Sequence, residues 1–170
     1  MAAEAREVLV QQMAIPWALA ESWCLPRLDD AMVHWAPSPH AVGLEARDGG
    51  WYPRMPDETA EPIPDVTCAW LLWHVEWWWS NALRGVAGEP ALGPDDVPWS
   101  GGAGASRATI ARLHDEWVAV LASADLDHPC SAPWPHPQPL SLVAAWVNLE
   151  LMKNVAELGQ LVRLHANRAA

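Results

Sequence analysis

A histidine in the middle of the chain has the surroundings that could make it chemically active. His74 lies in the stretch AWLLWHVEWWWS. At helical spacing it shares a face with Trp70, Trp77, Trp78 and Asn81. An imidazole among indoles loses hydration, which lowers its pKa and suits a general base or a metal ligand. The alternative is a hydrogen-bonded core histidine without a chemical role.

A second group of polar side chains lies near the C-terminus. On a helical wheel of residues 141–167, a polar strip runs between two apolar stripes and consists of Glu150, Lys153, Asn154 and Glu157, with Trp146 and Leu161 above and below. The strip is either a solvated face, with an i,i+4 pair between Lys153 and Glu157, or a wall of a site inside a bundle. Periodicity alone leaves both alternatives open.

The apolar stripes themselves are part of this prediction. One consists of Leu142, Ala145, Leu149, Met152, Ala156 and Gly159, and the other of Val147, Leu151, Val155, Leu158 and Val162. Because they flank the strip, we predict that the strip faces His74 across the bundle.

Together the two segments suggest one polar cavity. The predicted catalytic residues are His74, Lys153 and Glu157, with His74 as base and Lys153 as electrostatic anchor or acid. The predicted substrate-binding residues are Trp70, Trp77, Trp78, Asn81, Trp146, Glu150 and Asn154. We expect Trp70, Trp77 and Trp78 to be largely buried.

Four helices must position these residues. The first runs roughly over residues 3–22, with Pro16 as a kink, and the second over 63–85. Asp65 or Thr67 is expected to cap the second helix and Gly85 to end it. Ser106 is expected to cap the third helix and Ser141 the fourth.

The connections between the helices are rich in proline and glycine. Residues 37–64 are too long for a simple connection and are expected to form a lid or one wall of a site. No alternating pattern predicts strands, so the expected fold is all-α, an antiparallel helical bundle in a single domain over residues 1–170.

Composition excludes several classes of function. The 170 residues carry a formal net charge of −11 and only one lysine, which argues against a nucleic-acid surface. The richest apolar run is broken by His74 and Glu76 and is too short to span a membrane. Three cysteines without metal-ligand spacing, and no signal-peptide pattern, predict a cytoplasmic protein. The expected partner is a small molecule, and a homodimer is left open.

The aromatic residues are unusually distributed, with thirteen tryptophans and no phenylalanine. The indoles either fill the core, under a coding bias toward GC-rich codons, or wall a ligand pocket.

The segments AWLLWHVEWWWSNAL and AWVNLELMKNVAELGQL resemble the DinB/YfiT-like superfamily, and HWAPSPHAVGLEA, RLHDEWVAVLASADLDHPC and PWPHPQPLSLVAAW resemble its tryptophan-rich branch. The resemblance implies a four-helix bundle with up-down-down-up topology. Many members bind a divalent metal through one histidine of the second helix and an HxxxH pair before a Gly-Gln in the fourth. Several are thiol S-transferases or isomerases that use mycothiol or bacillithiol.

Carried over, the metal-binding positions fall on His74, Lys153 and Glu157. A protonated lysine cannot ligate a metal and repels it, so we expect no stoichiometric zinc or nickel at this site. The predicted function is therefore a small-molecule enzyme, in which a low-molecular-weight thiol is the cosubstrate that the resemblance suggests. Two alternatives remain: a non-catalytic ligand-binding or stress-related protein, and a metal-dependent S-transferase with a His/Glu site.

Overall fold

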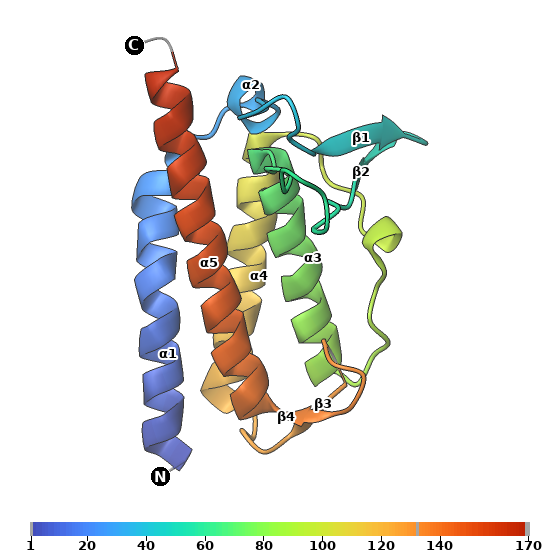
Figure 1. Cartoon of the computed structure of the whole chain (residues 1–170). Coiled ribbons are helices and arrows are strands. Elements are labelled where there is room, and N and C mark those ends of the chain that lie inside the picture. The colour runs from blue at the N-terminus through green and yellow to red at the C-terminus, as the bar shows by residue number, and fades with distance from the viewer. Residues whose placement is uncertain (1, 132, 169–170) are drawn as a thin grey trace.

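Four long helices dominate the computed structural model, which describes residues 2–131 and 133–168 (Figure 1). These helices are α1 (Ala2–Leu19), α3 (Cys68–Val86), α4 (Ala103–Ser123) and α5 (Leu140–Asn167). The shorter elements are a π-helical turn (Ala20–Cys24), a 3₁₀ turn (Leu25–Arg27), α2 (Asp30–Val33), β1 (Leu44–Arg47), β2 (Gly50–Pro53), a 3₁₀ turn (Pro94–Asp96), β3 (Pro129–Cys130) and β4 (Gln138–Pro139).

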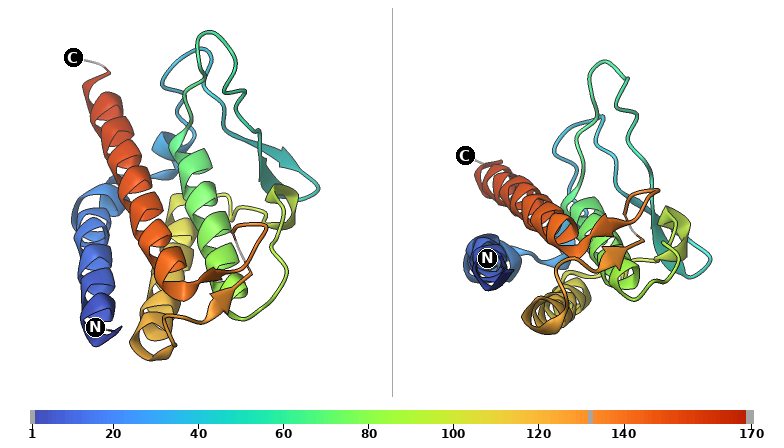
Figure 2. Two further views of the ribbon diagram at one scale, coloured as in Figure 1. Left: turned by 60° about the horizontal axis from the view of Figure 1, so that its bottom comes forward. Right: turned by 90° about the horizontal axis from the view of Figure 1, so that it is seen from below.

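The long helices lie side by side. In Figure 1, α1 and α5 run upward, whereas α3 and α4 run downward, and the second view of Figure 2 shows the four helices end-on. The helix α5 packs against α1 and α3, and α4 packs against α3. Trp73, Trp79 and Trp117 are the largest fully buried side chains of the core between them. None of the described helices is long and apolar enough to cross a bilayer.

Two short antiparallel hairpins correct the expectation that the chain has no strands. The first joins β1 to β2, with Leu44 paired to Pro53 and Arg47 to Gly50. Its turn places Asp48 and Gly49 at φ values of 51° and 80°, the left-handed region that hairpin turns require. The second joins β3 to β4. Strands of two to four residues are too short to leave a readable alternation, so turn chemistry was their only sequence signal.

Of the predicted N-terminal caps, only that of α3 is confirmed. Thr67 caps α3, because its side chain accepts a hydrogen bond from Trp70 N at 3.2 Å. The prediction of Ser106 as a cap was wrong: α4 begins at Ala103, whose N–H donates to Asp30 Oδ1 at 2.8 Å. The α4 cap therefore comes from α2, which is distant in sequence.

Two other predicted helix ends were also displaced. The helix α5 begins at Leu140, one residue before Ser141, with Pro139 at the N-cap position. The helix α3 continues through Gly85 to Val86. Both predictions relied on local residue preferences, and backbone contacts with other segments, such as that of Leu140 N with His128 O, set the actual ends.

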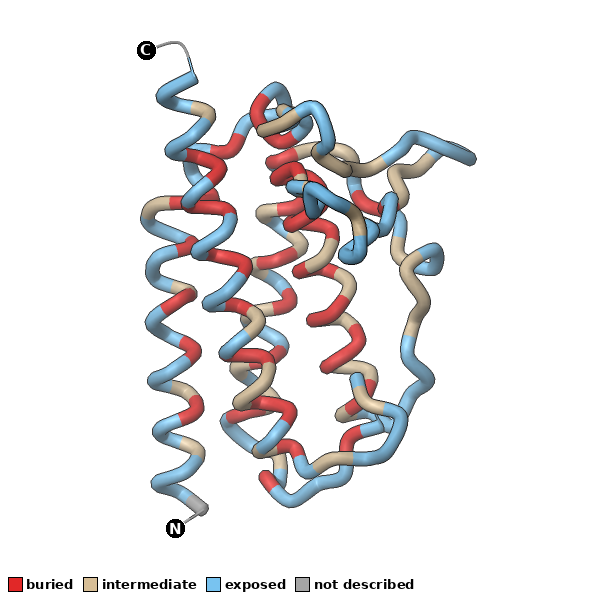
Figure 3. Tube along the Cα trace, in the orientation of Figure 1, coloured by how far each residue is buried: buried red, intermediate tan, exposed pale blue. Residues whose placement is uncertain are grey.

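The two predicted apolar stripes of α5 differ in how far they are buried. The stripe that contains Val147, Leu151 and Leu158 is buried, as the inward-facing red segments of Figure 3 illustrate. The other stripe is largely in water, and its Leu149 side chain is 70% exposed. Gly159 is its exception, because it packs beneath Trp23. The polar strip is therefore flanked by only one buried stripe.

Candidate active site between α3 and α5

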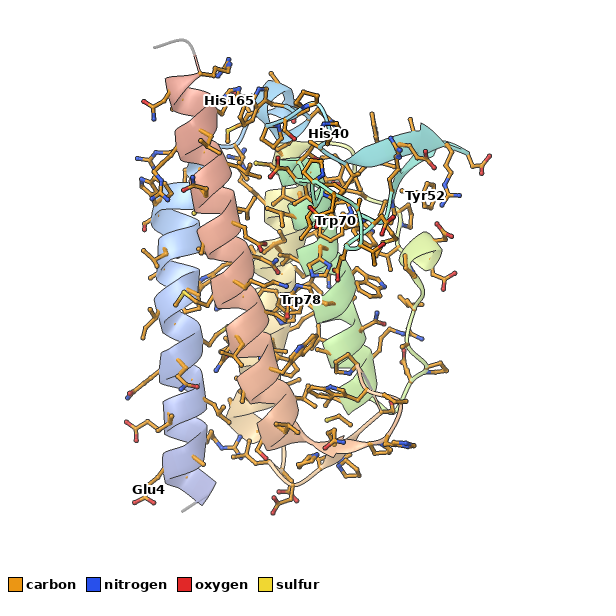
Figure 4. All side chains as sticks on the ribbon, viewed as in Figure 1. Glu4, His40, Tyr52, Trp70, Trp78 and His165 are labelled. Atoms are coloured by element: carbon orange, nitrogen blue, oxygen red, sulfur yellow. The ribbon has the colours of Figure 1, made fainter. Side chains whose placement is uncertain are left out.

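The polar strip of α5 meets His74 of α3, as the sequence predicted. His74 Nε2 lies 3.7 Å from Glu150 Oε2, and Lys153 Nζ lies 2.7 Å from the same oxygen. Trp70 and Trp78, both labelled in Figure 4, lie on α3 about one turn before and one turn after His74. One carboxylate oxygen thus stands between an imidazole and an ammonium group.

His74 is held in its neutral form. Its pKa is lowered from 6.5 to about 4, first by burial and next by the charge of Lys153, while the carboxylate of Glu150 acts in the opposite direction. The ring stacks on Trp70, with centroids 4.9 Å apart and planes inclined by 16°. Its Nδ1 atom is buried and has no hydrogen-bond partner among the described residues. Ring contacts therefore position the imidazole, and Nδ1 itself makes no hydrogen bond to the described residues.

Lys153 pairs with Glu150, three positions earlier, instead of with Glu157, four positions later. Glu157 has another partner, since its Oε2 accepts a hydrogen bond from Asn154 Nδ2 at 3.2 Å. Asn154 is buried, and its Oδ1 accepts from Trp78 Nε1 at 3.0 Å, so this contact connects the strip to α3. The Lys153 side chain is 48% exposed and therefore lies at the mouth of the site.

A cavity of about 540 Å³ opens on one side of His74. From the helices it is lined by Trp70, Leu71, His74, Lys153, Asn154, Glu157, Gln160, Leu161 and Leu164. Residues 56, 58 and 63–66, together with Pro37, form the opposite wall. The long irregular stretch before α3 thus forms one wall of the site, one of its two expected roles.

A second cavity, of about 240 Å³, lies on the other side of the same residues. It is lined by His74, Trp77, Trp78, Asn81, Ala91, Leu92, Pro133, Trp146, Glu150 and Lys153. His74 and Lys153 line both cavities, so they belong to a shared wall. Every residue that the sequence placed in the site lines one cavity or both.

The tryptophans of the site are buried to different degrees. Trp70 and Trp78 are buried, with exposed fractions of 8% and 2%, as predicted. Trp77 is only half-buried, which departs from the prediction of a largely buried ring. Its Nε1 donates to Leu92 O at 2.9 Å, so the segment after α3 covers one edge of the ring.

The residues present do not fit the divalent metal that the resemblance implies. The three positions supply one imidazole, His74, one carboxylate, Glu157, and the ammonium group of Lys153, which lies 2.7 Å from Glu150 Oε2 in the same site. A cation so close to a divalent ion is strongly repelled. Among the described residues, no group of three or more His, Cys, Asp and Glu side chains could hold a metal.

A buried acid on the opposite side of α3 was missed as a feature of interest. Glu76 is 5% exposed and accepts hydrogen bonds from Ser106 of α4. Burial raises its pKa to about 7, although Ser106, Trp99 and Arg112 act to lower it. Its sequence signal was a single acid inside an otherwise apolar helical run.

Fold and cavities define a helical bundle with two cavities between facing helices. A family model described as the DinB superfamily matches residues 17–158, most of the chain. The chain belongs to the DinB superfamily. Comparison with curated proteins and with solved structures gave no match.

Proposed function

We propose that this protein is a small-molecule enzyme that performs acid–base chemistry at the wall between its two cavities without a bound metal. The observation that supports this most directly is the neutral His74 imidazole beside the Glu150–Lys153 pair. Buried groups with perturbed pKa values in a cavity are typical of acid–base sites. We further propose that the bundle has the up-down-down-up topology of the superfamily.

His74 is the proposed base. The bond between hydrogen and a substrate heteroatom breaks, and the proton moves to the ring nitrogen of His74 that carries no proton. The imidazolium formed then lies 3.7 Å from a carboxylate oxygen, which stabilises its charge. Lys153 lines both cavities and offsets the negative charge left on the substrate. Glu157 holds Asn154 and is assigned a supporting role at the cavity mouth.

The proposed cosubstrate is a low-molecular-weight thiol, bound in the larger cavity. A thiol must lose its proton before it can attack an electrophile. Here neutral His74 is the group that accepts the proton, and the charge of Lys153 is what favours the thiolate. In the proposed reaction the thiolate sulfur forms a bond to an electrophilic carbon while the bond from that carbon to its leaving group breaks. The alternative is an isomerisation in which the thiol adds to the substrate and is released again.

A thiol-conjugation assay in the presence of a metal chelator tests this proposal. Mycothiol or bacillithiol is mixed with 1-chloro-2,4-dinitrobenzene, and thioether formation is followed by absorbance. We expect the protein to accelerate the reaction, and His74→Gln to lower kcat/KM by roughly 100-fold, as for loss of a positioned base. The control is Glu116→Gln, an exposed change on α4.

Two outcomes would reject the proposal. One is turnover that is unchanged in His74→Gln. The other is a wild-type protein that gives no acceleration over the uncatalysed reaction with either thiol. If acceleration appears only after zinc or nickel is added, the metal-dependent S-transferase becomes the better description.

A further inference from the structure

The smaller cavity has a chemical character of its own. We call it the indole chamber, and its walls are Trp77 and Trp78 of α3 and Trp146 of α5, with Glu150 and Lys153 at the wall shared with the larger cavity. The rings of Trp78 and Trp146 meet edge to face, with centroids 5.7 Å apart and planes inclined by 74°. Aromatic faces carry negative electrostatic potential, so a cation that lies against the face of one of these rings is attracted to it.

Most polar groups of the chamber walls are already occupied. Trp77 Nε1 donates to Leu92 O and Trp78 Nε1 to Asn154 Oδ1, at 2.9 and 3.0 Å. The Asn81 side chain exchanges two hydrogen bonds with the backbone of Leu92. These donors are therefore not available to an anionic ligand.

Glu150 is the acceptor that remains. Its Oε2 atom is buried and lacks a hydrogen bond of good geometry among the described residues, although Lys153 Nζ lies 2.7 Å away. The Lys153 side chain is half exposed and lines both cavities. It can therefore turn toward the larger cavity without leaving the site, and Glu150 would then be free to accept from a ligand.

The charge of the two linings also favours a cation. Glu150 is the carboxylate of the indole chamber, and Glu58, Asp65 and Glu157 line the larger cavity beside it, whereas Lys153 is the only lysine or arginine in either lining. A cavity lined by an excess of one sign attracts ligands of the other sign.

We propose that the indole chamber binds the cationic head of a small organic amine, which replaces the Lys153 ammonium at Glu150 and lies against the rings of Trp77, Trp78 and Trp146. The proposal rests on the proposed function, because it names the charge class of the substrate at the same site. The substrate is then an amine with an apolar or aromatic body, and its reacting group lies near His74 at the shared wall.

Calorimetric titration with three matched probes tests the charge class. The probes are 2-phenylethylammonium, neutral 2-phenylethanol and anionic 3-phenylpropanoate. We expect the ammonium to bind at least about tenfold more tightly than the other two. A cation–π contact with an indole ring, together with an ion pair to the Glu150 carboxylate, supports a ratio of this size. Equal or tighter binding of the alcohol or the acid, or no binding of the ammonium at millimolar concentration, would overturn the proposal.

Two variants test the role of the resident ammonium. Lys153→Met removes the competitor for Glu150, so it should tighten binding of the ammonium probe several-fold. Arg163→Met, which removes an exposed cation of α5 outside both linings, is the matched control and should leave binding unchanged. Weaker binding in Lys153→Met would show that Lys153 anchors ligands, which would overturn the proposal.

Glu150→Gln gives a second test, with thermal melting to verify that it folds. It should abolish the preference for the ammonium over the alcohol, and a retained preference would count against the proposal. The titrations measure binding alone. Failure of the charge preference is therefore distinct from failure of the thiol-conjugation assay with His74→Gln, which tests the proposed function.

Discussion

Two ionisable residues, half-buried His74 and buried Glu76, lie two positions apart on α3 in opposite environments. Glu76 faces α4, where Ser106 donates a hydrogen bond to it and Trp99 donates to Ser106 at 3.1 Å. His74 faces α5, where its Nδ1 atom has no partner among the described residues and cavities lie on both sides. One helix thus presents a sealed side to α4 and an open side to α5.

The contrast separates a structural polar group from a candidate chemical one. Burial is the main cause of both pKa shifts, and both favour the neutral form. The pKa of His74 is lowered to about 4, and that of Glu76 is raised to about 7. A shifted pKa therefore does not distinguish them. What distinguishes them is access, because a ligand can reach the open side, whereas side chains fill the sealed one.

The largest expected effect is the loss of a ring from the sealed side. Trp79 is fully buried and packs edge-on against Trp17, so Trp79→Ala should lower the free energy of unfolding by roughly 3–5 kcal/mol. Trp77 borders the indole chamber and is half-buried, so Trp77→Ala should cost roughly half of that or less. Urea denaturation measures both. Equal losses would contradict the division into sealed and open sides.

The pH dependence of stability should separate the two residues by sign. Because the pKa of His74 is lowered from 6.5 to about 4, the unfolded chain binds more protons in this window, and the wild type loses stability as pH falls through it. Because the pKa of Glu76 is raised from 4.5 to about 7, the native state binds more protons, and stability is lost as pH rises through that window. Each contribution has an upper limit of about 3 kcal/mol.

Denaturation between pH 4 and 8 in single and double variants checks these signs. Relative to wild type, His74→Gln should remove a loss at low pH, and Glu76→Gln should remove a loss at high pH. Parallel curves for the wild type and either variant would show that the residue does not titrate in the native state as described.

Histidines at the two changed ligand positions should give the open side a metal site. Lys153→His with Glu157→His places two imidazoles one helical turn apart on the wall that contains His74. We expect zinc affinity to rise by at least about 100-fold over the parent, or about 2.7 kcal/mol. Competition with a chromophoric chelator measures it. The matched control is Arg112→His with Glu116→His, the same spacing on exposed α4, which should bind zinc more weakly.

A parent protein that already holds about one equivalent of zinc or nickel would contradict this comparison. In that case Lys153 does not exclude the ion. The variant at positions 153 and 157 and the control at positions 112 and 116 should then bind zinc with similar affinity.

The smallest effect is expected from the Glu76 hydrogen bond. Ser106→Ala removes the donor and should cost about 1–2 kcal/mol of unfolding free energy while raising the pKa of Glu76 further. Ser123→Ala is the control, because Ser123 is exposed and bonds only the preceding turn of α4. If the two variants lose the same stability, the sealed side gains nothing from this bond.

The sequence alone determined the features that depend on local spacing. The 3.6-residue period placed His74 among tryptophans on one face of α3 and brought Glu150, Lys153 and Asn154 together on α5. Asp65 and Thr67 were the two predicted caps of α3, and Thr67 is the one whose side chain bonds a backbone N–H three residues away. Such features depend on neighbours within a turn or two, which are adjacent in the sequence.

Only the tertiary structure decided which local possibilities were realised. Lys153 could pair with Glu150 or with Glu157 along its own helix, and in the structure it pairs with Glu150. His74 lies beside Glu150, and Asn154 donates a hydrogen bond to Glu157. The sequence presented the two apolar stripes of α5 as equivalent. Packing of α1 and α3 against the helix buried one of them and left Leu149 of the other in water.

Periodicity predicted one polar cavity between the two helices, whereas the structure has two. The outer wall of the larger cavity comes from Pro37 and from residues 56, 58 and 63–66, and that of the smaller one from Ala91, Leu92 and Pro133. All of these residues lie outside the helices. Ser106 looked like a helix cap, yet it became the buried partner of Glu76 once Asp30 capped α4 from another segment. Contacts between residues far apart in the chain have no spacing rule, so the fold had to bring them together before the site could be recognised.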